Sequence, residues 1–232
     1  MNRNYCDILD RLLSYRRSLD KTQEEMSRQF GITQSHYSKI EAGSKIISFQ
    51  GLENFGKHGG DVSYLLTGER QVNGEIELYI NRCRTARSRK ALYKIIVWLL
   101  WQGLELSQVR GYELDDRSYR SLRLAEIELE EPAVWKNIRR LEGISQEKMA
   151  GRLDINIKRY GRIENGGAKP DAEIMNTLYT EFGYSPLIFL DVERFYANET
   201  NKIWNGFTED VREELEAVLK DAVCLIGKCE NR

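Results

Sequence analysis

The chain has 232 residues, a length that fits one large domain or two small ones. Its 35 basic and 36 acidic side chains give a net charge of −1, which by itself does not indicate a nucleic-acid partner. Only three prolines occur and apolar–polar alternation is rare, so the composition argues against a strand-rich protein and predicts a mostly helical one.

Side chains that build most metal and catalytic sites are scarce. The four cysteines form no Cys-x-x-Cys pair and there are two histidines, so we expect no metal and no cofactor. Reduced thiols and the lack of a basic-then-apolar leader predict a cytoplasmic protein. Neither a Gly-rich phosphate loop nor a Ser-His-Asp set can be assembled, which argues against an enzyme. The apolar run 95–101 is far shorter than the roughly 20 residues of a membrane span, so no membrane contact is expected.

Charge is unevenly distributed along the chain. Residues 132–170 hold nine basic side chains against four acidic ones, whereas 171–232 hold six against thirteen. Residues 1–60 are mildly positive, with nine against seven. The net charge therefore hides a basic stretch beside an acidic tail, a pattern compatible with a polyanionic partner.

Near the N-terminus the sequence predicts two short helices joined by a turn. Thr22 offers an N-cap hydroxyl, and Glu25 is placed for a capping box. Gly31 suits the left-handed residue that ends this helix. Thr33 then caps a second helix over 34–41. Two short helices joined by a turn that contains Gly are what a helix-turn-helix requires.

The chain repeats itself without a gap at an offset of 123 positions. Around the two short helices, the matching pairs are Arg16/Arg139, Arg17/Arg140, Gln23/Gln146, Glu24/Glu147, Met26/Met149, Ile32/Ile155, Tyr37/Tyr160, Ile40/Ile163, Glu41/Glu164 and Gly43/Gly166. A weaker match aligns the apolar stripe of 92–100 with that of 215–223, both at the spacing of an amphipathic helix. The pattern predicts a duplicated unit, each copy a helix-turn-helix followed by a helical appendage.

Segments 22–26, 31–35 and 40–43 resemble the Cro and phage-repressor family, also called the XRE family. The first match covers roughly 5–69 and the second roughly 133–191. This resemblance implies an all-α fold with two lambda-repressor-like five-helix DNA-binding domains, each followed by a helical hairpin. The predicted segments are a first domain at 1–69, a helical hairpin at 70–110, a polar connector at 111–131, a second domain at 132–191 and a C-terminal hairpin at 192–232.

The family resemblance also implies roles for the first helix-turn-helix, which we term the first head (22–43). Gln23 would bind a phosphate at the N-terminus of its helix, and the second helix would turn its outward side chains to the major groove. There Gln can pair with adenine, and Lys can reach guanine. The implied DNA contacts are Gln23, Thr33, Gln34, Ser35, His36, Ser38, Lys39 and Lys45.

A structural pair accompanies these contacts in the family. Arg16 and Glu41 match a largely buried ion pair that would clamp the first helix to the end of the recognition helix. Arg139 and Glu164 would be its second copy. Tyr37 and Ile40, three residues apart on the second helix, would point away from the DNA and into the core.

The second helix-turn-helix, which we term the second head (145–166), departs from this pattern. Ile157 stands where the first head has Gln34, and it can touch a thymine methyl but cannot donate to adenine. Gly161 lies inside the predicted helix at a cost of about 1 kcal/mol relative to Ala. Asp154 occupies the turn position of Gly31, which Asp adopts less easily. We therefore expect more phosphate binding than base reading from the implied contacts Gln146, Asn156, Lys158, Arg159, Arg162 and Lys169.

Together these features predict a sequence-specific DNA-binding regulator of transcription from a bacterium or a mobile element, with double-stranded DNA as its partner. Two other classes stay open: an antitoxin- or antagonist-like protein-interaction module, and a ligand- or peptide-sensing regulator whose hairpins form the pocket. The run 95–101 is apolar nearly all round and holds two tryptophans, which indicates an association surface. We expect a homodimer, and an intramolecular pseudo-dimer of the two repeats is the open alternative.

Overall fold

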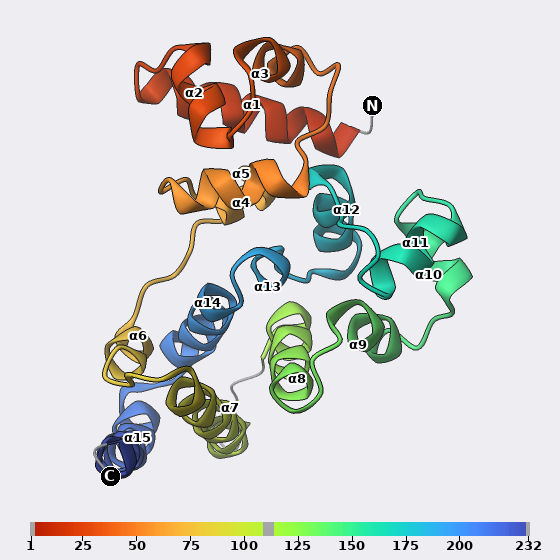
Figure 1. The fold of residues 1–232 in the computed structure, drawn as a ribbon. Coiled ribbons are helices and arrows are strands. Elements are labelled where there is room, and N and C mark those ends of the chain that lie inside the picture. Colours follow the sequence, from red (N-terminus) through yellow and green to blue (C-terminus); the bar gives the residue numbers. More distant parts are fainter. Residues whose placement is uncertain (1–2, 109–113, 231–232) are drawn as a thin grey trace. The chain divides into compact units, whose positions relative to one another are not determined.

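A computed structural model describes residues 3–108 and 114–230 of the chain (Figure 1). Every regular element in these ranges is a helix, which confirms the all-α class. The helices are α1 (Arg3–Ser18), α2 (Gln23–Phe30), α3 (Gln34–Glu41), α4 (Phe49–Lys57), α5 (Val62–Thr67), α6 (Glu75–Ile80), α7 (Ala86–Gln108), α8 (Asp116–Glu130), α9 (Val134–Leu141), α10 (Gln146–Arg152), α11 (Ile157–Glu164), α12 (Ala172–Phe182), α13 (Leu187–Leu190), α14 (Val192–Gly206) and α15 (Glu209–Glu230). Among them, none is long and apolar enough to cross a membrane.

The helices fall into two compact units, each built from two separate stretches of chain. Unit 1 comprises residues 1–71 and 142–190, and unit 2 comprises 72–141 and 191–232. This grouping differs from the consecutive segments expected from the sequence. Both heads, α2–α3 and α10–α11, lie in unit 1, whereas both hairpins lie in unit 2.

The helix bounds follow the offset of 123 positions. Helix α11 begins and ends 123 residues after α3, and α15 begins 123 residues after α7. The copy of α1 is different, because the corresponding stretch is divided between α8 and α9, with Pro132 between them. Proline lacks a backbone N–H donor and disfavours helical geometry in the residue before it, so the copy cannot continue as one helix.

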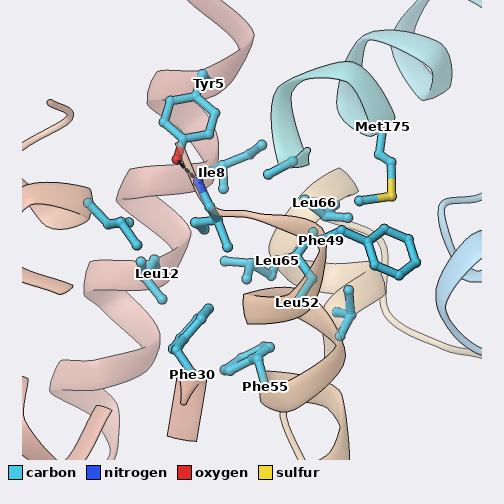
Figure 2. Close-up of a cluster of buried hydrophobic side chains, with 14 of the residues drawn as sticks. Tyr5, Ile8, Leu12, Phe30, Phe49, Leu52, Phe55, Leu65, Leu66 and Met175 are labelled. Carbon is cyan, nitrogen blue, oxygen red and sulfur yellow. Dashed lines mark hydrogen bonds between the residues drawn. The ribbon is translucent and has the colours of Figure 1, made fainter. Parts of the chain in front are cut away.

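The core of unit 1 is built by both repeats. In the first repeat, α1, α4 and α5 bury side chains such as Ile8, Leu52 and Leu66 (Figure 2). Helix α12 of the second repeat adds Ala172 and Met175, both 0% exposed, to the same cluster. The first repeat therefore completes its core with a helix that lies more than 100 residues further along the chain.

Hydrogen bonds reinforce this docking. The Ala172 N–H donates to the Ile47 carbonyl at 3.0 Å. The Asn176 side-chain amide donates to the carbonyl of Leu66, which is near the C-terminal end of α5. Carbonyls in the last turn of a helix have no partner within the helix, and this one is satisfied jointly by Asn176 of α12 and by Arg11 of α1.

In unit 2, the long helices of the two repeats pack antiparallel. The backbone N–H groups of Arg84 and Thr85, just before α7, donate to Glu230 at the end of α15, at 2.9 and 3.1 Å. Near the other end of α7, Gly103 faces Leu215 in the second turn of α15. Equivalent helices thus pair within one chain, as equivalent helices of two subunits pair in a two-fold dimer.

The apolar faces of α7 are largely covered inside unit 2. Helices α6, α8, α14 and α15 all contact it, and Ile96, Leu99 and Leu100 are no more than 1% exposed. Trp98 in the middle of the helix and Leu106 near its end stay exposed, at 55% and 43%. Most of the apolar run 95–101, which predicts association of two chains, is therefore buried inside unit 2 of a single chain.

The segment 111–131, expected to be a polar connector, contains α8; residues 111–113 lie outside the described residues. Leu122, Ala125 and Leu129 form a buried stripe at helical spacing. Glu128 is also buried and accepts hydrogen bonds from the Asn137 side chain and from the backbone at the start of α9. One of the acidic residues of this segment is therefore a buried hydrogen-bond acceptor that joins α8 to the start of α9.

Replacing two glycines by alanine tests how tightly the helices pack around them. A Cβ on Gly161 in α11 would meet no heavy atom within 4 Å, whereas one on Gly103 in α7 would lie 2.7 Å from Leu215 Cδ1 and from Phe207 Cε2. Gly161→Ala should raise the free energy of unfolding by about 1 kcal/mol, because Ala favours a helix. Gly103→Ala should lower it by about 1–3 kcal/mol through overpacking. Urea unfolding of both variants measures this, and a shift of the same sign in both would contradict the packing.

Candidate nucleic-acid interface

The first head forms through local signals in its own sequence. The Thr22 hydroxyl accepts from the Glu25 N–H at 3.2 Å, and Glu25 accepts from the Thr22 N–H at 2.8 Å, which completes the predicted capping box. Hydrogen bonds donated to the Glu25 carboxylate by the Thr22 backbone N–H, first of all, and by the Thr22 hydroxyl lower the pKa of Glu25. Gly31 is left-handed with φ of 67°, and Thr33 caps α3 by accepting from the His36 N–H. The predicted helix-turn-helix is therefore present.

Helix α3 separates an inner face from an outer one. Tyr37 and Ile40 are 0% and 2% exposed and belong to the core, as predicted. The side chains predicted to face DNA lie elsewhere on and around the helix. Gln34, Ser35, His36, Lys39, Thr33 and Lys45 are exposed, and Ser38 is half-buried.

Gln23 is engaged within the first head. Its Nε2 donates to Glu41 Oε2 at 2.8 Å, and its Oε1 accepts from Gln34 Nε2 at 3.2 Å. Glu41, Gln23 and Gln34 are thus joined in a row of hydrogen bonds, and the row ends at Gln34, the first residue of the recognition helix α3. This row fixes the Gln34 amide with its donor toward Gln23, and phosphate binding by Gln23 itself stays a prediction.

Glu41 is the junction of this network. Its carboxylate accepts from Arg16 Nε at 2.6 Å and from the Tyr37 hydroxyl at 2.9 Å, and its side chain is 8% exposed. Burial raises the pKa of Glu41, but the hydrogen bonds from Arg16, Gln23 and Tyr37 outweigh that effect and lower it. The expected ion pair between α1 and the end of α3 is present and largely buried, and it is charge-assisted at both partners.

The second head has the same helix cap, turn and Gln–Glu hydrogen bond as the first, but its outward-facing side chains differ. Asn156 caps α11 by accepting from the Arg159 N–H at 2.8 Å, as predicted. Asp154 adopts the left-handed turn position with φ of 53°. Gln146 donates to Glu164, which reproduces the pairing of Gln23 with Glu41 in the first head. The ion pair of Arg139 with Glu164 stays a prediction.

The basic side chains of the second head differ in their surroundings. Arg159 forms an ion pair with Asp171 at 2.6 Å, and Arg162 Nη2 donates to the Gly167 carbonyl at 3.4 Å. Lys158 is exposed on α11. Lys169 lies with its ammonium 4.9 Å from the ring centre of Phe49, at the start of α4 in the first repeat. This basic set is therefore not confined to the second head.

Sequence reasoning did not find Asp171 as a functional residue. Its carboxylate caps α12 by accepting from the Ile174 N–H at 3.1 Å and also holds Arg159. The signal for the cap is visible, because Asp precedes a helical stretch. The ion pair is not visible in the sequence, because it depends on how the loop 165–171 folds back to α11.

Removing Glu41 should destabilise unit 1 strongly. Glu41→Ala leaves the Arg16 guanidinium, 19% exposed, and the Tyr37 hydroxyl without their acceptor, so we expect a loss of about 3 kcal/mol in the free energy of unfolding. Because the folded pKa of Glu41 lies below its unfolded value, this stabilisation is complete above the unfolded pKa and is lost as pH falls through the folded pKa.

Thermal unfolding at neutral and acidic pH measures this effect. Glu24→Ala is the matched control, because Glu24 and its partner Arg28 are 64% and 73% exposed and such a pair contributes little. Similar melting temperatures for the two variants would show that Glu41 is not a buried junction.

Comparison with known families matches the two heads separately. A helix-turn-helix model, of the Cro/C1 type of the XRE family, matches residues 12–52, and a helix-turn-helix domain model matches 136–193. The first match contains the first head, and the second contains the second head. The chain matches no curated protein and no solved structure. With both heads built as a helix-turn-helix and matched separately, the chain carries two XRE-like helix-turn-helix domains in tandem, which supports a DNA-binding regulator.

Proposed function

We propose that the protein is a sequence-specific DNA-binding regulator of transcription, in which the first head reads bases. The observation that carries this proposal is the outer face of α3. Gln34, Ser35, His36 and Lys39 are all exposed there, while Tyr37 anchors the opposite face in the core. A recognition helix needs this combination, because it must present polar side chains to the major groove from a fixed axis.

The hydrogen bond from Gln34 to Gln23 suits the recognition of adenine. One proton of Gln34 Nε2 is directed to Gln23 Oε1, which sets the orientation of the amide. The second Nε2 proton can donate to adenine N7, and Gln34 Oε1 can accept from adenine N6. Lys39, five residues further along α3, can reach guanine O6 or N7.

The second head supports phosphate binding more than base reading. Ile157 is 49% exposed at the start of α11, where it can contact a thymine methyl but supplies no hydrogen bond. Lys158 and Arg162 are exposed cations on the same helix. Contacts of this kind position a protein on DNA and are strongly salt-dependent.

A second candidate function concerns the second head alone. An exposed Ile157 and an Arg159 that is engaged by Asp171 also suit a protein-binding surface that kept the helix-turn-helix fold. In that case the first head binds DNA and the second head binds a protein.

Association of two chains stays a prediction. Trp98 is the large apolar side chain of α7 that remains 55% exposed in the middle of the helix, beside Trp101 and the ion pair of Lys94 with Glu130. A homodimer through α7 would therefore be centred on Trp98, on a smaller apolar area than the sequence indicates.

Replacing Gln34 tests base reading by the first head. Sites selected from a random DNA pool by the full chain define the preferred sequence. Gln34→Ala should then lower affinity for that sequence by about 1–3 kcal/mol and leave affinity for random DNA nearly unchanged. Equal losses on both DNAs would show that Gln34 does not read bases.

Replacing the exposed cations of α11 tests whether the second head contacts DNA. Each phosphate contact contributes nearly one unit to the slope of log affinity against log salt, so Lys158→Ala with Arg162→Ala should flatten the slope by about 1–2 units. Arg159→Ala is the comparison, and we expect a smaller change because Arg159 is paired with Asp171. An unchanged slope in the double variant would favour the protein-binding alternative.

A further inference from the structure

The loops that follow the two recognition helices meet in unit 1. After α3, the Ser44 and Lys45 N–H groups both donate to the Lys39 carbonyl, at 2.9 and 3.2 Å, and the chain then reaches Ile47. The Ile47 carbonyl accepts from the Ala172 N–H at 3.0 Å. We term this junction of the loops 44–48 and 165–171 the seam.

On the other side, the seam is tied to α11. The Gly167 and Ala168 N–H groups both donate to the Arg162 carbonyl, at 2.7 and 3.1 Å. The ion pair of Arg159 with Asp171 joins the recognition helix directly to the N-cap of α12. Both recognition helices are therefore connected to the seam through short hydrogen-bonded loops rather than through a flexible linker.

The seam is also fixed to the core. The Tyr5 hydroxyl accepts from the Ile47 N–H at 2.8 Å and donates to the Lys45 carbonyl at 3.3 Å. Directly behind the seam, Ala172 and Met175 are fully buried in the cluster of Figure 2. To move α12 relative to the first repeat, these side chains would have to leave the core, and the ion pair of Arg159 with Asp171 holds α11 to the start of α12. A flexible linker between independent domains would impose neither restriction.

The seam carries positive charge toward its surface. Lys45 is exposed on the side of the first repeat, and the Lys169 ammonium lies over Phe49 on the side of the second. Exposed lysines between two recognition helices suit a phosphate backbone that runs past both.

From this arrangement we propose that one chain reads a single DNA element with two unlike half-sites at one fixed spacing, and that the seam sets this spacing. The proposal rests on the proposed DNA-binding function and specifies the form of the DNA partner. The two half-sites differ because Gln34 in one recognition helix is replaced by Ile157 in the other. An identical pair of subunits would instead require a palindrome.

A spacer series on duplex DNA tests the proposal with the unmodified chain. The site selected from a random pool is lengthened between its two half-sites by about five or about ten base pairs, half a turn and a full turn of B-DNA. We expect both insertions to lower affinity at least tenfold. The full-turn insertion returns the second half-site to the same face, so a flexibly linked pair of heads would recover its affinity there.

Two controls separate the possible failures. Randomising the half-site of the second head should lower affinity by a similar factor to the insertions, because an insertion also places that head on unselected sequence. Randomising the half-site of the first head, which carries Gln34, should lower affinity further, and light scattering of the complex should give one chain of 27.1 kDa per element. Selection that enriches no sequence would refute the proposed function itself. Enrichment of a palindrome bound by two chains, of one half-site only, or of a pair that tolerates the full-turn insertion would overturn the fixed-spacing proposal and leave DNA binding intact.

Discussion

The docking of α12 into the first repeat is the constraint on which unit 1 depends. The last turn of α5 has carbonyls without partners in the helix, and they are satisfied from outside it. Arg11 on α1 donates to the carbonyls of Leu65 and Leu66 at 2.9 and 3.0 Å, and Asn176 on α12 donates to that of Leu66 as well. The second repeat therefore completes both the apolar core and the polar end of a first-repeat helix, so the two repeats form one folding unit there.

The hydrogen-bond network at Glu41 links the packing of unit 1 to the orientation of Gln34 on the recognition helix. A single carboxylate accepts from Arg16, Tyr37 and Gln23, and Gln23 in turn orients Gln34. Because a buried carboxylate needs its donors to stay charged, none of these side chains can move without cost. The position of Gln34, the side chain proposed to read a base, is thus coupled to the packing of α1 on α3.

Local features of the fold were predictable from the sequence, because each depends on a few neighbouring residues. The caps at Thr22, Thr33 and Asn156 and the left-handed turn at Gly31 are of this kind. Helix α8 was missed, because its many charged residues obscured a short apolar stripe. The seam could not be predicted, since the hydrogen bond of Ala172 with Ile47 joins residues 125 positions apart and depends on shape complementarity that one sequence does not display.

Duplication within one chain removes a restriction that subunit symmetry imposes. In a two-fold dimer every change in a recognition helix appears twice, so both half-sites change together. Here the scaffold residues agree between the repeats, as in the pairings of Gln23 with Glu41 and of Gln146 with Glu164. The outward residues do not agree. A fixed scaffold with two independently variable faces favours one asymmetric DNA element, because rigidity preserves the spacing while each recognition helix is free to acquire its own chemistry.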